Sequence, residues 1–201
     1  MPAALTSPLS IFLAFGVYAV IHSLLASFAA KDLGETFFGK AGRKYYRLFF
    51  NIVGTLTLLP VLALPVLLPD TPLYTIPAPW SYLTAAVQLA AALLLLYSVI
   101  QTGALDFLGL SQAAGIKTND TLNTSGLYRF MRHPLYTFSM LFLWLTPVMT
   151  ANLAALYLAI SVYFYVGALF EERKLVRIFG QQYIDYRAHT PMLLPRLWGG
   201  G

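Results

Sequence analysis

Residues 130–170 read FMRHPLYTFSMLFLWLTPVMTANLAALYLAISVYFYVGALF, and this stretch decides the fold class. It contains two apolar runs, from about Phe130 to Met149 and from Asn152 to Phe170, joined by the short turn TPVMTAN. A turn of that length is too short to leave the membrane region and return, so the two runs predict a helical hairpin. The first run is the shorter one once its polar start is set aside. We expect it to be tilted or to span only part of the bilayer.

Three further apolar runs precede the hairpin, from Leu9 to Ala30, from Tyr46 to Leu68 and from Trp80 to Thr102. Each exceeds the ~20 residues that a helical membrane span needs. The chain is 58% hydrophobic and 10% charged, whereas a soluble domain carries about 25% charged residues. The sequence therefore predicts an all-α fold: a polytopic membrane helical bundle of about five transmembrane helices, forming a single integral membrane domain over residues 1–201.

The 13 Lys and Arg residues fall only on alternate connections between the apolar runs. Basic connections face the cytoplasm, so we expect the N-terminus outside and the C-terminus in the cytoplasm, in a bacterial inner membrane. The net charge of +5 then reflects topology, and no nucleic-acid partner is expected. The three basic groups are Lys31, Lys40, Arg43, Lys44 and Arg47; Lys117, Arg129 and Arg132; and Arg173, Lys174, Arg177, Arg187 and Arg196.

Several kinds of segment and site are not expected. Residues Met1 to Ser10 carry no Lys or Arg, and a secretory signal peptide needs a basic start. The chain has no Cys, which excludes disulfides, thiolate nucleophiles and Cys-based metal sites. The stretch GETFFGKA has the spacing of a P-loop, but Ala41 stands where the Mg²⁺ ligand belongs. No G-x-G-x-x-G motif is present.

The C-terminal segment FEERKLVRIFGQQYIDYRAHTP (170–191) predicts cytoplasmic helices after the last span. The last apolar helix is expected to continue to about Phe179, with Gly180 as its stop. A second short helix then places Tyr183 and Tyr186 on one face.

Glu171 and Glu172 form a carboxylate pair at the membrane boundary. For the pair taken alone, a solvated helix face balanced by Arg173 and Lys174 is the favoured interpretation.

The stretch GLYRFMRHPLYTF (126–138) begins the fourth apolar run. Pro134 suits the first turn of a helix, which places Arg132 and His133 at the helix N-terminus. That end attracts carboxylates and phosphates, and Arg132 adds a forked cation. A basic membrane anchor would explain the arginines and the proline, but it requires neither His133 nor Tyr136.

A helical hairpin brings its two open ends together, so this cationic start and the glutamate pair should meet. An amino-acid-like ligand needs a cation for its carboxylate and an anion for its ammonium group. Four aromatic residues could line a purine or a sulfonium: Tyr128, Tyr136, Tyr183 and Tyr186. S-adenosylmethionine has all of these groups.

Polar residues inside the apolar runs are further candidates. His22 lies in the first run, and Arg47, Asn51 and Thr55 share one face of the second. Such residues mark functional sites in membranes, but they also hold bundles together through interhelical hydrogen bonds. Both interpretations stay open for His22, and the structural one is favoured for Asn51.

The motifs together resemble those of the isoprenylcysteine carboxyl methyltransferase superfamily of integral membrane enzymes. The resemblance rests on R-H-P-x-Y (132–136) preceded by G-x-Y, on E-E-R-x-L (171–175), and on F-G and Y-x-x-Y before the terminal prolines. HSLLAS, YYRLFFN, LDFLGLSQ and WLTPVMT are similar to the bacterial branch, which includes methanethiol S-methyltransferase and the NnrU-like proteins.

This resemblance implies a pocket for S-adenosylmethionine over the hairpin. His133 and Tyr136 would hold the methionine part, and Glu171 or Glu172 would take its ammonium group. Arg132 and Glu172 would be the catalytic residues. The residues implied around the adenosine are the backbone at Gly126 and Tyr128, with Tyr183 or Tyr186.

The acceptor side would include His22, Arg47 and Asn51. Family members often have a small residue where this chain has Phe138, which would narrow an acceptor tunnel and disfavours a bulky prenyl substrate.

The sequence thus predicts methyl transfer from S-adenosylmethionine to a small lipophilic acceptor, a thiol by preference, that arrives from the bilayer lipids. The enzyme would align the reactants and exclude water, without a metal. One alternative is an NADPH-dependent membrane reductase of the sterol-reductase type. It would need a basic cluster within residues 104–125, which hold only Lys117. A non-catalytic membrane protein is the other alternative; it would tolerate Glu172→Gln and His133→Ala.

Overall fold

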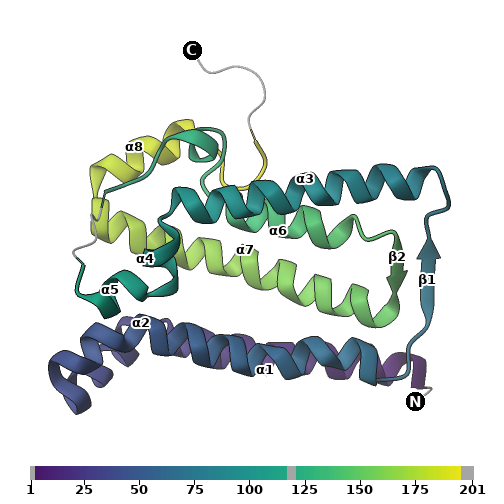
Figure 1. Cartoon of the computed structure of the whole chain (residues 1–201), viewed down its shortest axis with the longest axis horizontal. Coiled ribbons are helices and arrows are strands. Elements are labelled where there is room, and N and C mark those ends of the chain that lie inside the picture. The colour runs from purple at the N-terminus through teal and green to yellow at the C-terminus, as the bar shows by residue number, and fades with distance from the viewer. Residues whose placement is uncertain (1–2, 117–120, 196–201) are drawn as a thin grey trace. The chain divides into compact units, whose positions relative to one another are not determined.

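The computed structural model describes residues 3–116 and 121–195. The described elements are mainly helical (Figure 1). In chain order they are α1 (Ala3–Leu25), α2 (Phe28–Leu67), β1 (Pro72–Thr75), α3 (Trp80–Gln101), α4 (Ala104–Leu108), α5 (Leu110–Ala114), the 3₁₀ turn η1 (Gly126–Arg129), α6 (Pro134–Trp144), β2 (Val148–Thr150), α7 (Ala151–Phe179) and α8 (Gln181–His189). Two basic residues of the topology pattern, Lys117 and Arg196, lie outside the described residues.

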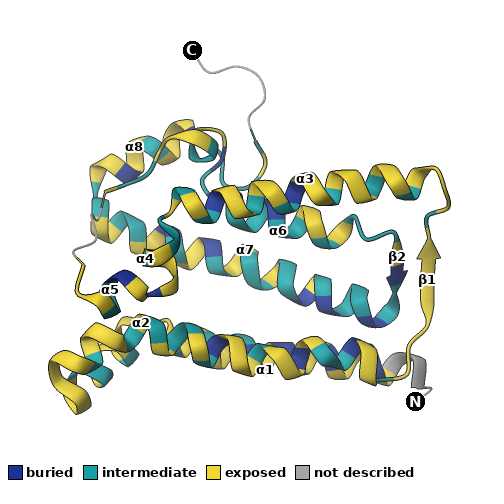
Figure 2. Ribbon diagram, viewed as in Figure 1, coloured by how far each residue is buried: buried dark blue, intermediate teal, exposed yellow. Residues whose placement is uncertain are grey.

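Four of these helices, α1, α2, α3 and α7, are long and apolar enough to cross a membrane. Many of their large apolar side chains are exposed. In Figure 2 the exposed class covers much of α1, α2 and α3, whereas α7 is mostly intermediate. A soluble fold buries most such side chains, so their exposure fits contact with lipid. The predicted all-α, polytopic membrane fold is confirmed, with four long spans and one shorter apolar helix, α6.

The shorter helix corrects the expected bounds of the fourth apolar run. α6 has 11 residues, a length of about 16 Å against a bilayer core of about 30 Å. It starts at Pro134, whose missing N–H costs nothing in a first turn. It ends before Pro147, because a residue that precedes proline disfavours the helical conformation.

The chain after α6 nevertheless reaches the far side through extended backbone. β2 pairs with β1, which lies in the connection between α2 and α3. The Ile76 N–H also donates to the Pro147 carbonyl at 2.8 Å. α7 therefore begins on the same side as the α2–α3 connection, as the alternation of basic segments requires.

The described chain forms two compact units. The first contains α1, α2, α4, α5 and the start of α7 up to Ala159. The second contains α3, η1, α6, α8 and the rest of α7.

In the first unit, α2 bends at Gly39, whose φ of 58° favours glycine. It then runs through Pro60 and Pro65 and ends at Leu67.

The end of α2 is completed by Asn152, which is 0% exposed. Its Nδ2 donates to the carbonyls of Pro65, Leu68 and Pro69 at 3.5, 3.3 and 3.2 Å. Pro69 has no N–H to offer the Pro65 carbonyl, so a side chain from α7 supplies the donor.

In the second unit, α6 packs along the part of α7 from Ile160 onward, as the predicted hairpin requires, and α3 packs on α6. Trp144 Nε1 donates to Ser161 Oγ at 2.9 Å near one end, and Tyr136 stacks on Phe164 toward the other. α7 continues past its apolar part and stops before Gly180, whose φ is 56°. α8 follows directly, as the sequence predicts.

Candidate active site

The start of α6 is held by the C-terminal strap, which we define as residues 190–195. The N–H groups of Arg132 and His133 donate to the carbonyls of Pro191 and Met192 at 2.9 and 3.1 Å. Thr137 Oγ1 donates to the Leu193 carbonyl at 2.7 Å. Because these two N–H groups already donate to the strap, they are not available to the anion that the sequence predicts at this helix start.

Arg132 and Glu172 form a buried ion pair, each side chain being 9% exposed. Arg132 Nε and Nη2 lie 2.6 and 2.5 Å from Glu172 Oε1. Arg132 Nη1 donates to the carbonyls of Thr190 and Arg187. One guanidinium thus ties together α7, the end of α8 and the start of α6.

Glu171 has a different environment from its neighbour, because 44% of its side chain is exposed. Tyr136 Oη donates to Glu171 Oε2 at 2.9 Å, and His133 Nδ1 lies 3.5 Å from the same oxygen. The adjacent glutamates therefore differ: the Glu172 carboxylate is paired and buried, whereas the Glu171 carboxylate is oriented and accessible.

His133 lies between the two carboxylates and is 5% exposed. Its Nε2 is 3.4 Å from Glu172 Oε1 but makes no hydrogen bond. Its ring stacks on Tyr136, with centroids 5.4 Å apart and planes at 11°, and Tyr136 stacks on Phe164 at 4.9 Å. Three rings thus form a column from the strap into the hairpin.

The turn η1 approaches the same cluster through its backbone. Tyr186 Oη donates to the Tyr128 carbonyl at 2.5 Å. Gly126 has a φ of 58°, and a Cβ there would lie 1.7 Å from Gln101 Nε2. Gln101 Oε1 accepts the Leu127 N–H at 3.1 Å. The glycine therefore allows the turn to pack directly on the end of α3.

Tyr183 adds a buried hydroxyl beside this turn. It is 1% exposed and packs edge-on against Tyr186, with centroids 5.9 Å apart. Its hydroxyl lies near Arg132 but has no hydrogen bond of normal geometry. Burial, helped by the charge of Glu172, raises the pKa of Tyr183 to about 12. The phenol is therefore neutral at physiological pH.

The structure brings all of the predicted cofactor-binding residues and both predicted catalytic residues into one cluster of the second unit: Gly126, Tyr128, Arg132, His133, Tyr136, Glu171, Glu172, Tyr183 and Tyr186. Gln101 and Phe164 were missed. A polar residue at the end of the third apolar run was the available signal for Gln101. No local signal marks Phe164, because an aromatic residue in an apolar helix is ordinary.

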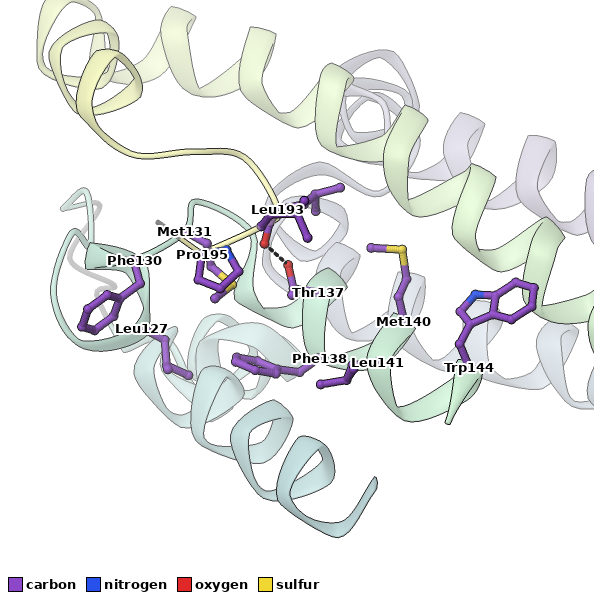
Figure 3. Close-up of a pocket in the computed structure, with 11 residues that line it drawn as sticks. Leu127, Phe130, Met131, Thr137, Phe138, Met140, Leu141, Trp144, Leu193 and Pro195 are labelled. Carbon is purple, nitrogen blue, oxygen red and sulfur yellow. Dashed lines mark hydrogen bonds between the residues drawn. The ribbon is translucent and has the colours of Figure 1, made fainter. Parts of the chain in front are cut away.

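Phe138 lies apart from this cluster. It is 8% exposed and two residues from Tyr136, which turns the two side chains about 200° apart on α6. It lines an apolar groove of about 670 Å³ instead (Figure 3). The groove is lined by Leu127, Phe130, Met131, Thr137, Phe138, Met140, Leu141, Trp144, Leu193, Leu194 and Pro195.

His22, Arg47 and Asn51 belong to the first unit. The His22 ring packs between Tyr18 and Phe50, with centroids at 5.3 and 4.5 Å.

Asn51 Nδ2 donates to the Phe107 carbonyl at 2.9 Å, and the Arg47 backbone packs closely against Gly109. These contacts give all three residues a role in packing, and their role toward the acceptor stays a prediction.

A polytopic helical membrane protein with a polar cluster at the mouth of its last hairpin is the class that fold and site define. Comparison with known proteins indicates the class of reaction. The family model described as "Phospholipid methyltransferase" matches residues 85–182. "Methanethiol S-methyltransferase 2" from Bradyrhizobium diazoefficiens is 32% identical over 192 residues, covering 92% of this chain and 72% of that protein.

Two further relatives match over shorter regions. "Methanethiol S-methyltransferase" from Mycobacterium tuberculosis is 42% identical over 69 residues, covering 34% of this chain and 28% of that protein. "Protein-S-isoprenylcysteine O-methyltransferase B" from Arabidopsis thaliana is 35% identical over 77 residues, covering 37% and 39%. No solved structure matches the chain.

The chain belongs to the phospholipid and isoprenylcysteine methyltransferase family, as its motifs predict. It is a membrane methyltransferase. The reductase and the non-catalytic protein considered from the sequence receive no support from these relatives.

Proposed function

We propose that this protein transfers a methyl group from S-adenosylmethionine to a small lipophilic thiol that enters from the bilayer. The observation that carries the proposal is the accessible Glu171 carboxylate, held by Tyr136 and His133 at the mouth of the hairpin. Family membership supplies the reaction class.

The residues of the cluster fit S-adenosylmethionine. Glu171 would take its ammonium group, since a hydrogen-bonded and half-exposed carboxylate suits a ligand cation. Two buried polar atoms in the cluster, His133 Nε2 and the Tyr183 hydroxyl, have no hydrogen-bond partner in the described chain. Buried polar groups are normally paired, so both are candidates for ligand contacts.

The cluster contributes binding and alignment to the reaction. Arg132 and Glu172 satisfy one another and the strap carbonyls, so we assign them to positioning the site and no longer to direct contact with the reacting atoms. The aromatic column of His133, Tyr136 and Phe164 excludes water from the hairpin mouth. When bound, S-adenosylmethionine supplies an electrophilic sulfonium methyl. Glu171, Tyr136 and His133 would hold the cofactor, and its methyl–sulfonium bond would break as the acceptor thiolate forms the new C–S bond, which leaves a neutral thioether.

A thiol acceptor is supported by the names of the relatives, which describe methanethiol as their own substrate. The thiolate, not the neutral thiol, is the nucleophile, so the acceptor must lose its proton before or during attack on the methyl group.

Purified protein with methyl-labelled S-adenosylmethionine tests the proposal against a panel of thiols, prenylcysteines and amine-bearing lipids. We expect label in small lipophilic thiols. Glu171→Gln should weaken S-adenosylmethionine binding about tenfold or more in calorimetry, because a hydrogen bond to a charged group is lost. Glu35→Gln, which breaks an exposed pair with Arg43 in the first unit, is the matched control. If the wild-type protein does not bind S-adenosylmethionine, the proposed cofactor is wrong. If the methyl label appears only in amine-bearing lipids, the proposed thiol acceptor is wrong.

We also propose that the N-terminus faces outward and the α8 end faces the cytoplasm, in a bacterial inner membrane. The alternating basic segments support this orientation. Phosphatase and fluorescent-protein fusions after α2 and after α8 test it. Phosphatase activity after α8 would refute it.

A further inference from the structure

The groove along α6 provides a second site that the proposed reaction does not use. One wall is α6 from Thr137 to Trp144, and the opposite walls are the strap and the segment around η1 (Figure 3). Leu193, Leu194 and Pro195 of the strap lie in the lining. The groove is therefore formed by one region, from η1 through α6, and by the strap, which lies about 50 residues later in the sequence.

The walls of the groove offer almost no hydrogen bonds. Thr137 Oγ1 is committed to the Leu193 carbonyl, and Trp144 Nε1 to Ser161. Apolar cavities of this kind do not hold water favourably. A groove of about 670 Å³ on an apolar membrane helix is therefore best filled by hydrocarbon.

The dimensions of α6 fit one lipid chain. α6 has 11 residues, or about 16 Å, and one leaflet of the hydrocarbon core is about 15 Å deep. A chain that enters beside η1 and ends near Trp144 would cross one leaflet along the helix.

The hydrophobic effect cannot favour an acyl chain in the groove over one in the bulk bilayer, because the surrounding lipid tails are equally apolar. Selection must come from close packing and from the headgroup. Arg129 lies in η1 between two groove residues, Leu127 and Phe130. It is exposed, and its side chain makes no hydrogen bond or ion pair within the described residues. A phosphate at the end of η1 would provide the missing partner.

We propose that the groove holds one acyl chain of an anionic phospholipid whose phosphate binds Arg129. This lipid is a resident ligand and not the methyl acceptor, so the proposal does not depend on the proposed function. Because the strap forms one wall, the bound chain also supports the strap that caps Arg132.

Native mass spectrometry of the intact protein tests the site with phosphatidylglycerol, which has no amine to methylate, and with phosphatidylcholine. We expect one retained lipid, with about a fivefold preference for phosphatidylglycerol, the contribution of one basic side chain near a membrane surface. Arg129→Gln should remove the preference. Arg177→Gln changes an exposed arginine on α7 and should keep it.

A larger side chain in the groove tests whether an acyl chain occupies it. Leu141 and Phe142 are adjacent and each 40% exposed, but only Leu141 lines the groove. Leu141→Trp should lose the retained lipid, and Phe142→Trp should keep it. If Leu141→Trp does not fold by circular dichroism, Leu141→Phe provides the smaller filling variant.

Several results would overturn the proposal. They are equal lipid retention by the Leu141 and Phe142 variants, or an unchanged headgroup preference after Arg129→Gln. A dimer that replaces the lipid adduct would assign the groove to a second copy. A long-chain thiol that displaces phosphatidylglycerol and is then methylated would assign it to the acceptor.

Discussion

We expect the same substitution to destabilise the protein to very different extents at the two adjacent glutamates. Glu172 is 7% exposed and neutralises Arg132, which is buried with it. Glu172→Gln removes the charge while keeping the size of the side chain, so Arg132 stays buried without a counter-ion. Glu171→Gln changes a half-exposed side chain, and the carbonyl oxygen of the glutamine can still accept a hydrogen bond from the Tyr136 hydroxyl.

Removing one partner of a buried ion pair costs about 3–5 kcal/mol, because the other charge remains out of water. Arg132 keeps its bonds to the carbonyls of Thr190 and Arg187, so we expect the lower end, about 3 kcal/mol, for Glu172→Gln. For a chain of this length that loss lowers the unfolding midpoint by roughly 6–12 °C. Glu171→Gln should change stability by less than about 1 kcal/mol.

Thermal unfolding followed by circular dichroism in one detergent measures both variants. The double variant Arg132→Met with Glu172→Leu removes both charges and should recover at least half of the loss, because coupled partners are not additive. The reasoning is refuted if Glu172→Gln is as stable as the wild type. It is equally refuted if Glu171→Gln loses as much stability as Glu172→Gln.

Three other predictions follow from the same cluster. Tyr186→Phe removes the hydrogen bond to the Tyr128 carbonyl and should lower the free energy of unfolding by about 1 kcal/mol. Tyr183→Phe removes a hydroxyl that has no normal hydrogen-bond partner, so the stability should not change. A larger loss for Tyr183→Phe than for Tyr186→Phe would contradict this assignment. Gly126→Ala should lower the free energy of unfolding by about 1–3 kcal/mol, because of the left-handed backbone at this position and a clash with Gln101. Adding Gln101→Ala should recover part of this loss. If the effects of the two substitutions are fully additive, the two residues are independent. With a thiol acceptor, the single-turnover rate should rise about tenfold per pH unit until the acceptor's own pKa, and the break should move when a more acidic thiol is used; a break that stays fixed would indicate an enzyme base instead.

Local patterns in the sequence predicted the large features of this protein correctly. Apolar runs of about 20 residues located the four spans, since hydropathy and length alone decide whether a helix can cross lipid. Gly180 ended α7 as expected, because a glycine tolerates a positive φ that other residues resist. The bounds of α6 were predicted less well: apolar character extends to Met149, but the prolines that flank the helix limit it to 11 residues.

The pattern of residues thus predicted the class of fold, the alternation of basic segments and the residues that gather at the hairpin mouth. How the two glutamates divide their roles follows from three-dimensional packing, because both carry the same charge at adjacent positions. Their difference comes from partners about 40 residues away: Arg132 reaches Glu172, and Tyr136 reaches Glu171. The tertiary structure likewise decided that the strap occupies two N–H groups at the α6 start and that Phe138 faces a separate groove. Such pairings depend on helix rotation and long-range packing, which the hydrophobic pattern of a single membrane helix does not specify.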